Sequence, residues 1–195
     1  MINVGGISTK AFDDNGKIRY RFRDESEIRQ AVNEAISSRK GQKPIHTGIR
    51  GIPSLIPDVD DAVDSMSRQQ YLYNKTSGIR IREEMLSVSD DELDACFGEE
   101  MIKDIADRFS GYYYYKGFQN SYGVYRYDDD RGKGYDVLYT INSVSFRDGS
   151  KYVRNSYEYE EELLRAAKTV VSEVTKAQIP EDDFFDMATL EYYGQ

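Results

Sequence analysis

The spacing of apolar residues changes partway along the chain, and this change limits the possible folds more than any other feature. In residues 24–39, 58–73 and 89–111, apolar side chains recur every three or four positions, as on one face of a helix. From Tyr112 onward the period falls to about two, which is typical of strands. A helical period returns over 158–177. The pattern predicts an α+β fold: amphipathic helices plus a four-stranded antiparallel meander with a closing helix packed on it.

The four strands are expected at 112–118, 122–127, 135–146 and 151–154. In the first strand, Tyr112 and Tyr114 would face one way, and Tyr113 and Tyr115 the other. Twelve of the 17 tyrosines lie between residues 112 and 159, more than one buried face needs. Two interpretations stay open. In the first, these tyrosines form a sheet with one solvent-exposed face. In the second, they form an aromatic contact surface, because tyrosine is enriched at protein interfaces.

Five segments follow from composition and period. Residues 1–23 form an N-terminal hairpin with a tight turn at Asn15-Gly16. Residues 24–39 form a helix that Asp24 and Glu27 open as a capping box. Residues 40–57 are an extended basic arm rich in proline and glycine. Residues 58–179 form the α+β core, and residues 180–195 are an acidic aromatic tail.

The arm has three of the chain's four prolines and no regular period. Between Ala35 and Pro57 there are four basic side chains and no acidic one, while its isoleucines argue against simple disorder. It is either a surface loop packed on its own domain or an arm that reaches a neighbouring chain. The second interpretation predicts contacts by Arg39, Lys40, Lys43, Ile45, Ile49, Arg50 and Ile52. Further partner contacts are expected from Tyr112, Tyr113, Tyr114, Tyr115, Phe184, Phe185, Tyr192 and Tyr193.

The net charge of the chain is −9, and residues 58–195 carry all of the excess negative charge. An acidic body repels nucleic acid at long range. We therefore do not expect direct nucleic-acid binding. No apolar run approaches the roughly 20 residues of a membrane span, and the N-terminus does not read as a secretory signal. With a single cysteine as well, the expected location is the cytoplasm, or a particle assembled there.

The residues that usually carry chemistry are scarce. His46 is the only histidine and lies in the proline-rich segment, which is a poor platform for a general base. Cys96 falls on the apolar side of its helix and is expected in the core. One histidine and one cysteine do not make a zinc site. We therefore assign no catalytic, cofactor-binding or metal-binding residue and expect no cofactor.

Carboxylates gather at one hairpin end, in "YDDDRGKGYD". Oxygen ligands of this kind suit Ca²⁺ or Mg²⁺, but the calcium-loop spacing fails, because Lys133 and Tyr139 occupy the positions for glycine and glutamate. A solvated turn is the simpler interpretation. Asp136, with Lys133 nearby, matches only a small part of the acidic residues and lysine of a two-metal nuclease.

These observations favour a non-enzymatic protein–protein interaction or assembly component, forming homo-oligomers or a larger assembly. A structural subunit of a phage-type particle fits the tyrosine-rich composition with no tryptophan and almost no cysteine or histidine. One alternative is an acidic inhibitor that imitates a nucleic-acid backbone and blocks a nucleic-acid-binding enzyme. Another is a carboxylate-metal enzyme. A mimic would need a continuous acidic row, whereas an assembly subunit would need apolar or aromatic patches.

Overall fold

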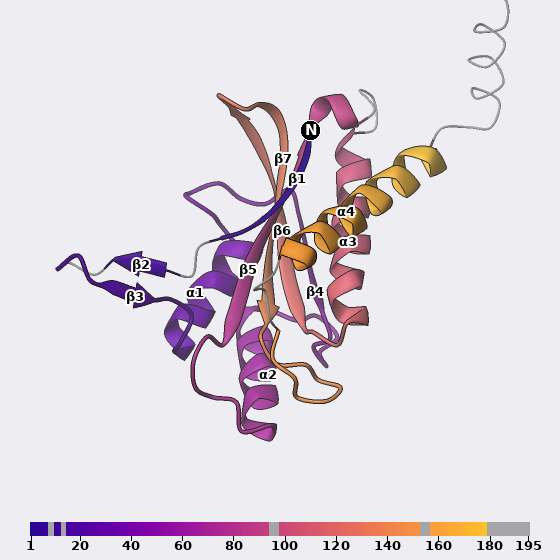
Figure 1. Cartoon of the computed structure of the whole chain (residues 1–195). Coiled ribbons are helices and arrows are strands. Elements are labelled where there is room, and N and C mark those ends of the chain that lie inside the picture. Colours follow the sequence, from indigo (N-terminus) through magenta and orange to yellow (C-terminus); the bar gives the residue numbers. More distant parts are fainter. Residues whose placement is uncertain (8–9, 13–14, 94–97, 153–156, 179–195) are drawn as a thin grey trace, which may run out of the picture.

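A five-stranded antiparallel sheet forms the centre of the molecule, and helices cover both of its faces (Figure 1). The computed structural model describes residues 1–7, 10–12, 15–93, 98–152 and 157–178. The strand order is β1-β5-β7-β6-β4, and β2 and β3 form a separate two-stranded ribbon. The strands are β1 (Ile2–Gly6), β2 (Lys10–Phe12), β3 (Ile18–Tyr20), β4 (His46–Arg50), β5 (Ile81–Ser89), β6 (Asn120–Asp129) and β7 (Gly132–Asn142).

Helices α1 and α2 lie on one face of the sheet, and α3 and α4 lie on the other (Figure 1). The helices are α1 (Glu25–Ile36), α2 (Val59–Leu72), α3 (Gly98–Tyr115) and α4 (Tyr157–Gln178), with a 3-10 turn at Asp90–Glu92. The larger hydrophobic core fills the space between the sheet, α3 and α4. A smaller core lies between α1, α2 and Ile81. The α+β class is therefore confirmed.

The four-stranded meander is wrong in detail. Only β6 and β7 form a consecutive hairpin within the main sheet, and β1, β4 and β5 come from earlier parts of the chain. Of the predicted strand at 151–154, the structure describes residues 151 and 152, and among these Lys151 forms an isolated bridge with Val144. Strand β5 was missed, because its centre carries the adjacent acids Glu83 and Glu84 and does not alternate.

The N-terminal predictions are confirmed in part. The hairpin forms as β2 and β3, and Gly16 has a φ of 72°. Its register pairs Phe12 with Ile18, which leaves five residues in the loop, so the predicted tight turn at Asn15-Gly16 is wrong. Residues 2–6, however, leave the hairpin and pair with β5 at the edge of the main sheet. The cap of α1 is as predicted, since the Asp24 carboxylate accepts the backbone N–H of Glu27 at 2.9 Å. Helix α1 ends at Ile36, three residues before the expected end at residue 39.

The four consecutive tyrosines end α3 and are not a strand, so the predicted two-face split is wrong. Phe109 and Tyr113 are four residues apart and continue the buried stripe of Ile102 and Ile105. Tyr113 is completely buried, Tyr112 is half-buried, and Tyr114 and Tyr115 face solvent. The helical period of α3 therefore extends one turn further than the strand preference of tyrosine suggests.

Tyr113 holds a carboxyl group inside the larger core. Its hydroxyl donates to Glu84 Oε2 at 2.7 Å, and the Tyr152 hydroxyl donates to Glu84 Oε1 at 2.8 Å. Glu84 is completely buried near the middle of β5. A buried carboxyl is tolerated only with such partners, because desolvation without hydrogen bonds is costly.

We expect Tyr113→Phe to lower the free energy of unfolding by about 2 kcal/mol, because a buried carboxyl oxygen loses a donor. Chemical denaturation measures the change. The matched control is Tyr115→Phe, two residues on, whose side chain is 80% exposed and which should change stability by less than about 0.5 kcal/mol. Equal effects in the two variants would contradict the assigned hydrogen bond.

Candidate functional site

A groove of about 420 Å³ lies between α2, residues 51–54 and the C-terminal end of α3. It is open along one side and has both polar and apolar walls. Its lining includes Ile52, Ser65, Arg68, Gln69, Tyr114 and Phe146. Pockets of roughly 300–1,000 Å³ are the usual size for ligand sites, so this groove can hold a few side chains of a partner.

Gln119 ties two walls of the groove together. Its side-chain amide donates to the Gly51 carbonyl and to Ser65 Oγ, both at 2.9 Å, while its Oε1 accepts from Asn142 Nδ2 at 2.9 Å. Gly51 has a φ of 77°, and a Cβ there would come within 3.2 Å of the Tyr114 ring. The segment after β4 thus runs close to α3 because a glycine occupies this position.

Exposed apolar and aromatic side chains lie beside the groove. Tyr114 packs on Phe146 with ring centroids 5.2 Å apart, and the Arg147 guanidinium lies 6.0 Å from the Tyr115 ring centre. Along α2, Leu72 continues the groove-facing row of Asp61, Ser65 and Arg68, because these residues are spaced by three or four positions. Leu72 is 73% exposed. Exposed apolar side chains therefore lie next to a groove whose lining is partly polar.

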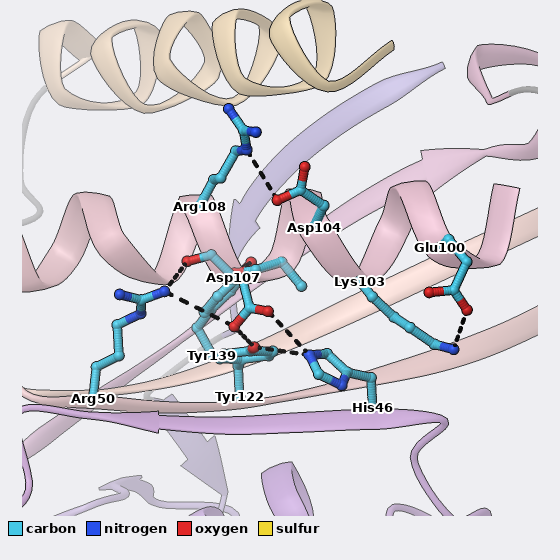
Figure 2. A network of polar contacts seen from close by, with 10 residues as sticks. His46, Arg50, Glu100, Lys103, Asp104, Asp107, Arg108, Tyr122 and Tyr139 are labelled. Atoms are coloured by element: carbon cyan, nitrogen blue, oxygen red, sulfur yellow. Dashed lines mark hydrogen bonds and ion pairs between the residues drawn. The ribbon is translucent and has the colours of Figure 1, made fainter. Parts of the chain in front are cut away.

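A second cluster, of polar groups, fastens β4 to α3 (Figure 2). Asp107 on α3 accepts a hydrogen bond from the Tyr122 hydroxyl, and its Oδ2 lies 3.3 Å from His46 Nε2. The Tyr122 oxygen is 3.2 Å from the same His46 nitrogen. Arg50 Nη2 donates to the Asp107 backbone carbonyl at 2.9 Å. His46 and Arg50, at the two ends of β4, thus both contact Asp107.

The geometry of this cluster fits a structural link between β4 and α3 better than a catalytic centre. Burial raises the pKa of the Tyr122 phenol well above its ordinary value, and the hydrogen bond to Asp107 raises it further. The phenol stays protonated at neutral pH and donates to the carboxylate, so it is not an activated nucleophile. A Cβ at Gly48 would lie 2.5 Å from the Tyr122 ring, so the glycine in β4 gives this side chain its space.

The other charged side chains in Figure 2 form pairs along α3. Lys103 Nζ is 2.8 Å from Glu100 Oε1, and Arg108 Nε is 3.0 Å from Asp104 Oδ1. These pairs are spaced by three or four residues. Such pairs on a helix surface contribute only a few tenths of a kcal/mol each. These charged pairs lie on the surface of α3, and they indicate no binding chemistry.

Three carboxylates of the β6–β7 hairpin end are paired with basic side chains. Asp128 lies 3.4 Å from Lys133, and Arg131 contacts Asp129 at 2.8 Å and Asp136 at 3.2 Å. Ser87 also donates to Asp136 at 2.6 Å. Among the described residues, no group of three or more His, Cys, Asp and Glu side chains is placed to hold a metal ion. The hairpin end thus offsets part of its negative charge, since one arginine and one lysine stand against four aspartates.

The residues predicted to contact a partner are divided between several places. Of the segment 40–57, residues 46–50 form β4 and pair with β6, so this part belongs to the sheet. Ile49 and Ile52 pack against the smaller core, while Lys40 and Lys43 are exposed near the start of the segment. Arg39 contacts the Met85 sulfur at 3.6 Å. Whether any of these residues meets a partner stays a prediction.

The groove brings together Ile52 and Tyr114 from that predicted set, with Tyr115 on its rim. Phe184, Phe185, Tyr192 and Tyr193 lie outside the described residues, as does Cys96. Sequence reasoning missed the groove-facing row of α2, Gln119 and Phe146. The exposed Leu72 was the available signal, since it departs from the buried stripe of α2.

Comparisons with known proteins bear on the fold alone. No protein-family model matches the chain, and no curated protein matches it. A solved structure described as "Molecular Basis of Vancomycin Resistance Transfer in Staphylococcus aureus" aligns over 92% of this chain and 94% of its own, with a TM-score of 0.53 and 11% identity. Among the described helices, none combines the length and apolarity needed to cross a bilayer. The chain shares an architecture with that structure.

Proposed function

We propose that this chain is a non-enzymatic assembly component that contacts other protein chains, copies of itself among them, through the groove between α2 and α3. The observation that carries the proposal is the pair of exposed apolar side chains beside the groove, Leu72 and Tyr115, which are 73% and 80% exposed. Burying apolar surface contributes roughly 25 cal/mol per Å². Exposed apolar surface next to polar residues is typical of a protein contact site.

The chemistry of the described residues supports a binding role. The only histidine is held by Asp107 and Tyr122, and the Tyr122 phenol has a raised pKa. Asp128, Asp129 and Asp136 of the β6–β7 hairpin form ion pairs with Arg131 and Lys133. One form of such an assembly is a phage-type particle, as the composition suggests.

The test is the mass of the purified chain over a wide concentration series, measured by sedimentation velocity. We expect the wild-type chain to associate and Leu72→Glu to raise the dissociation constant at least about tenfold, because it places a charge in the contact. Leu72 is exposed, so its replacement should leave the melting temperature nearly unchanged.

The matched control is Ile18→Glu, which changes an exposed apolar residue on the β2–β3 ribbon, away from the groove. It should associate as the wild type does. A wild-type chain that stays monomeric throughout, or equal effects of the two substitutions, would contradict the proposal.

A further inference from the structure

We propose that the groove of one copy receives the segment that follows α4 in a second copy, with Phe184 and Phe185 as the inserted side chains. This inference rests on the proposed function and names the occupant of the same groove. It follows from the chemistry of the groove, the composition of residues 179–195, and the direction in which α4 runs.

The groove offers aromatic walls and a basic end. Tyr114 and Phe146 form a paired aromatic wall, against which other rings pack well in tilted or offset arrangements. Arg68 lines the groove and forms no hydrogen bond or ion pair with another residue in the described part of the chain. Arg147 flanks Tyr115 at the rim. Asp61 and Asp64 lie toward the N-terminal end of α2, so the two ends of the groove differ in charge.

Residues 179–195 have the complementary composition. They contain no lysine or arginine, and their acids are Glu181, Asp182, Asp183, Asp186 and Glu191. Acids stand on both sides of the Phe184-Phe185 pair. Two adjacent aromatic side chains between acids match an aromatic wall next to unpaired arginine, because apolar burial and charge attraction then act together.

The direction of α4 shows which copy supplies the segment. Glu162 lies near the start of α4 and contacts Lys116, just after the end of α3. Glu173 lies further along α4, 4.0 Å from Arg108, which is about two turns before the end of α3. Helix α4 therefore leads away from the end of α3 where the groove lies. Figure 1 shows the last turns of α4 at the upper right and the ends of α2 and α3 at the bottom.

The chain between the end of α4 and Phe184 is too short to bring Phe184 back to the groove of the same copy. From Glu162 to Gln178 a helix rises about 24 Å, at 1.5 Å per residue. The six residues from Gln178 to Phe184 span at most about 22 Å when fully extended. Phe184 thus falls short of the groove in its own chain, which lies beyond the Glu162 end of α4. A neighbouring copy brings its own groove within reach.

A contact between different surfaces of two copies is heterologous, so a pair of copies keeps one free groove and one free segment. The predicted product is an open series or a ring of copies. This property gives a direct test with two full-length variants. Leu72→Glu impairs the groove and leaves the segment intact, while the double variant F184S/F185S impairs the segment and leaves the groove intact.

Sedimentation velocity and native mass measurement are applied to each variant alone and to an equimolar mixture. Each variant alone should be at least tenfold weaker in association than the wild type. The mixture should form a one-to-one pair and no larger species, because only one intact groove meets one intact segment. A synthetic peptide of residues 179–195, added in excess, should dissociate the wild-type assembly. Unchanged melting of both variants shows that they are folded.

The outcomes separate this inference from the proposed function. If Leu72→Glu weakens association while F184S/F185S associates as the wild type does, the groove binds a different surface and the inference is overturned. The formation of species larger than a one-to-one pair in the mixture would also overturn the inference. If neither variant changes association, both the inference and the proposed function are contradicted.

Discussion

Replacing Gly123 with alanine is expected to lower the free energy of unfolding by about 3 kcal/mol. Gly123 lies in β6 where the C-terminal turn of α1 crosses the sheet, and a Cβ there would overlap the Ala35 carbonyl oxygen. The Tyr125 hydroxyl donates to that same carbonyl at 3.1 Å. Helix α1 would have to move away from the sheet and lose this bond, and such overpacking typically costs 1–3 kcal/mol or more.

Chemical denaturation of the two alanine variants Gly123→Ala and Gly5→Ala provides the measurement and its control. Gly5 also lies in a strand of the main sheet, but no atom lies within 4 Å of a Cβ built there. Gly5→Ala should change stability by less than about 0.5 kcal/mol. A tolerated Gly123→Ala would mean that α1 does not pack against β6 as described.

The second large effect concerns the pH dependence of stability. Glu83 is only 3% exposed, and its Oε1 has no hydrogen-bond partner among the described residues. The pKa of Glu83 is raised from 4.5 to about 7, chiefly by burial; Arg21 and Arg39 oppose this rise, and Glu34 adds to it. Between these two pH values the folded state keeps a proton that the unfolded state releases.

The free energy of unfolding should therefore fall as pH rises from about 4.5 to 7, and the contribution of Glu83 to this loss is about 3 kcal/mol. Glu83→Gln should remove the loss. At pH 8 the variant is expected to be about 3 kcal/mol more stable than the wild type, and at pH 4 nearly equal to it. Denaturant titrations across this range check the result, with Glu161→Gln, an exposed change, as the control. A constant difference at every pH would exclude the assigned role.

Some parts of the fold followed from local pattern because local energies decide them. The helices α1, α2 and α4 bury one face at a helical period, and Asp24 and Asp58 cap the first two through backbone N–H groups three residues on. The β2–β3 turn uses Gly16 at positive φ. These features depend on neighbours within a few residues, so sequence spacing is enough to predict them.

Strand pairing and the end of α3 depended on contacts distant in the sequence. Tyr113 lies in a helix because its ring packs between Phe109 and Tyr139 and its hydroxyl reaches Glu84. Nothing local distinguishes this from the strand that four tyrosines favour. The pair Glu83 and Glu84 obscured β5, since the tyrosine partners of Glu84 come from α3 and from residue 152.

The amino-acid pattern was enough to predict the α+β class, the four helical segments apart from the end of α3, the N-terminal ribbon, and the scarcity of groups that carry chemistry. The order of the five strands, the place of residues 46–50 at the sheet edge, and the groove became visible in the folded chain. Helix periods and caps are set by interactions over three or four residues, so they can be predicted from local spacing. The groove requires Gly51, Ser65 and Gln119 to meet, and that meeting is set by packing across the whole chain.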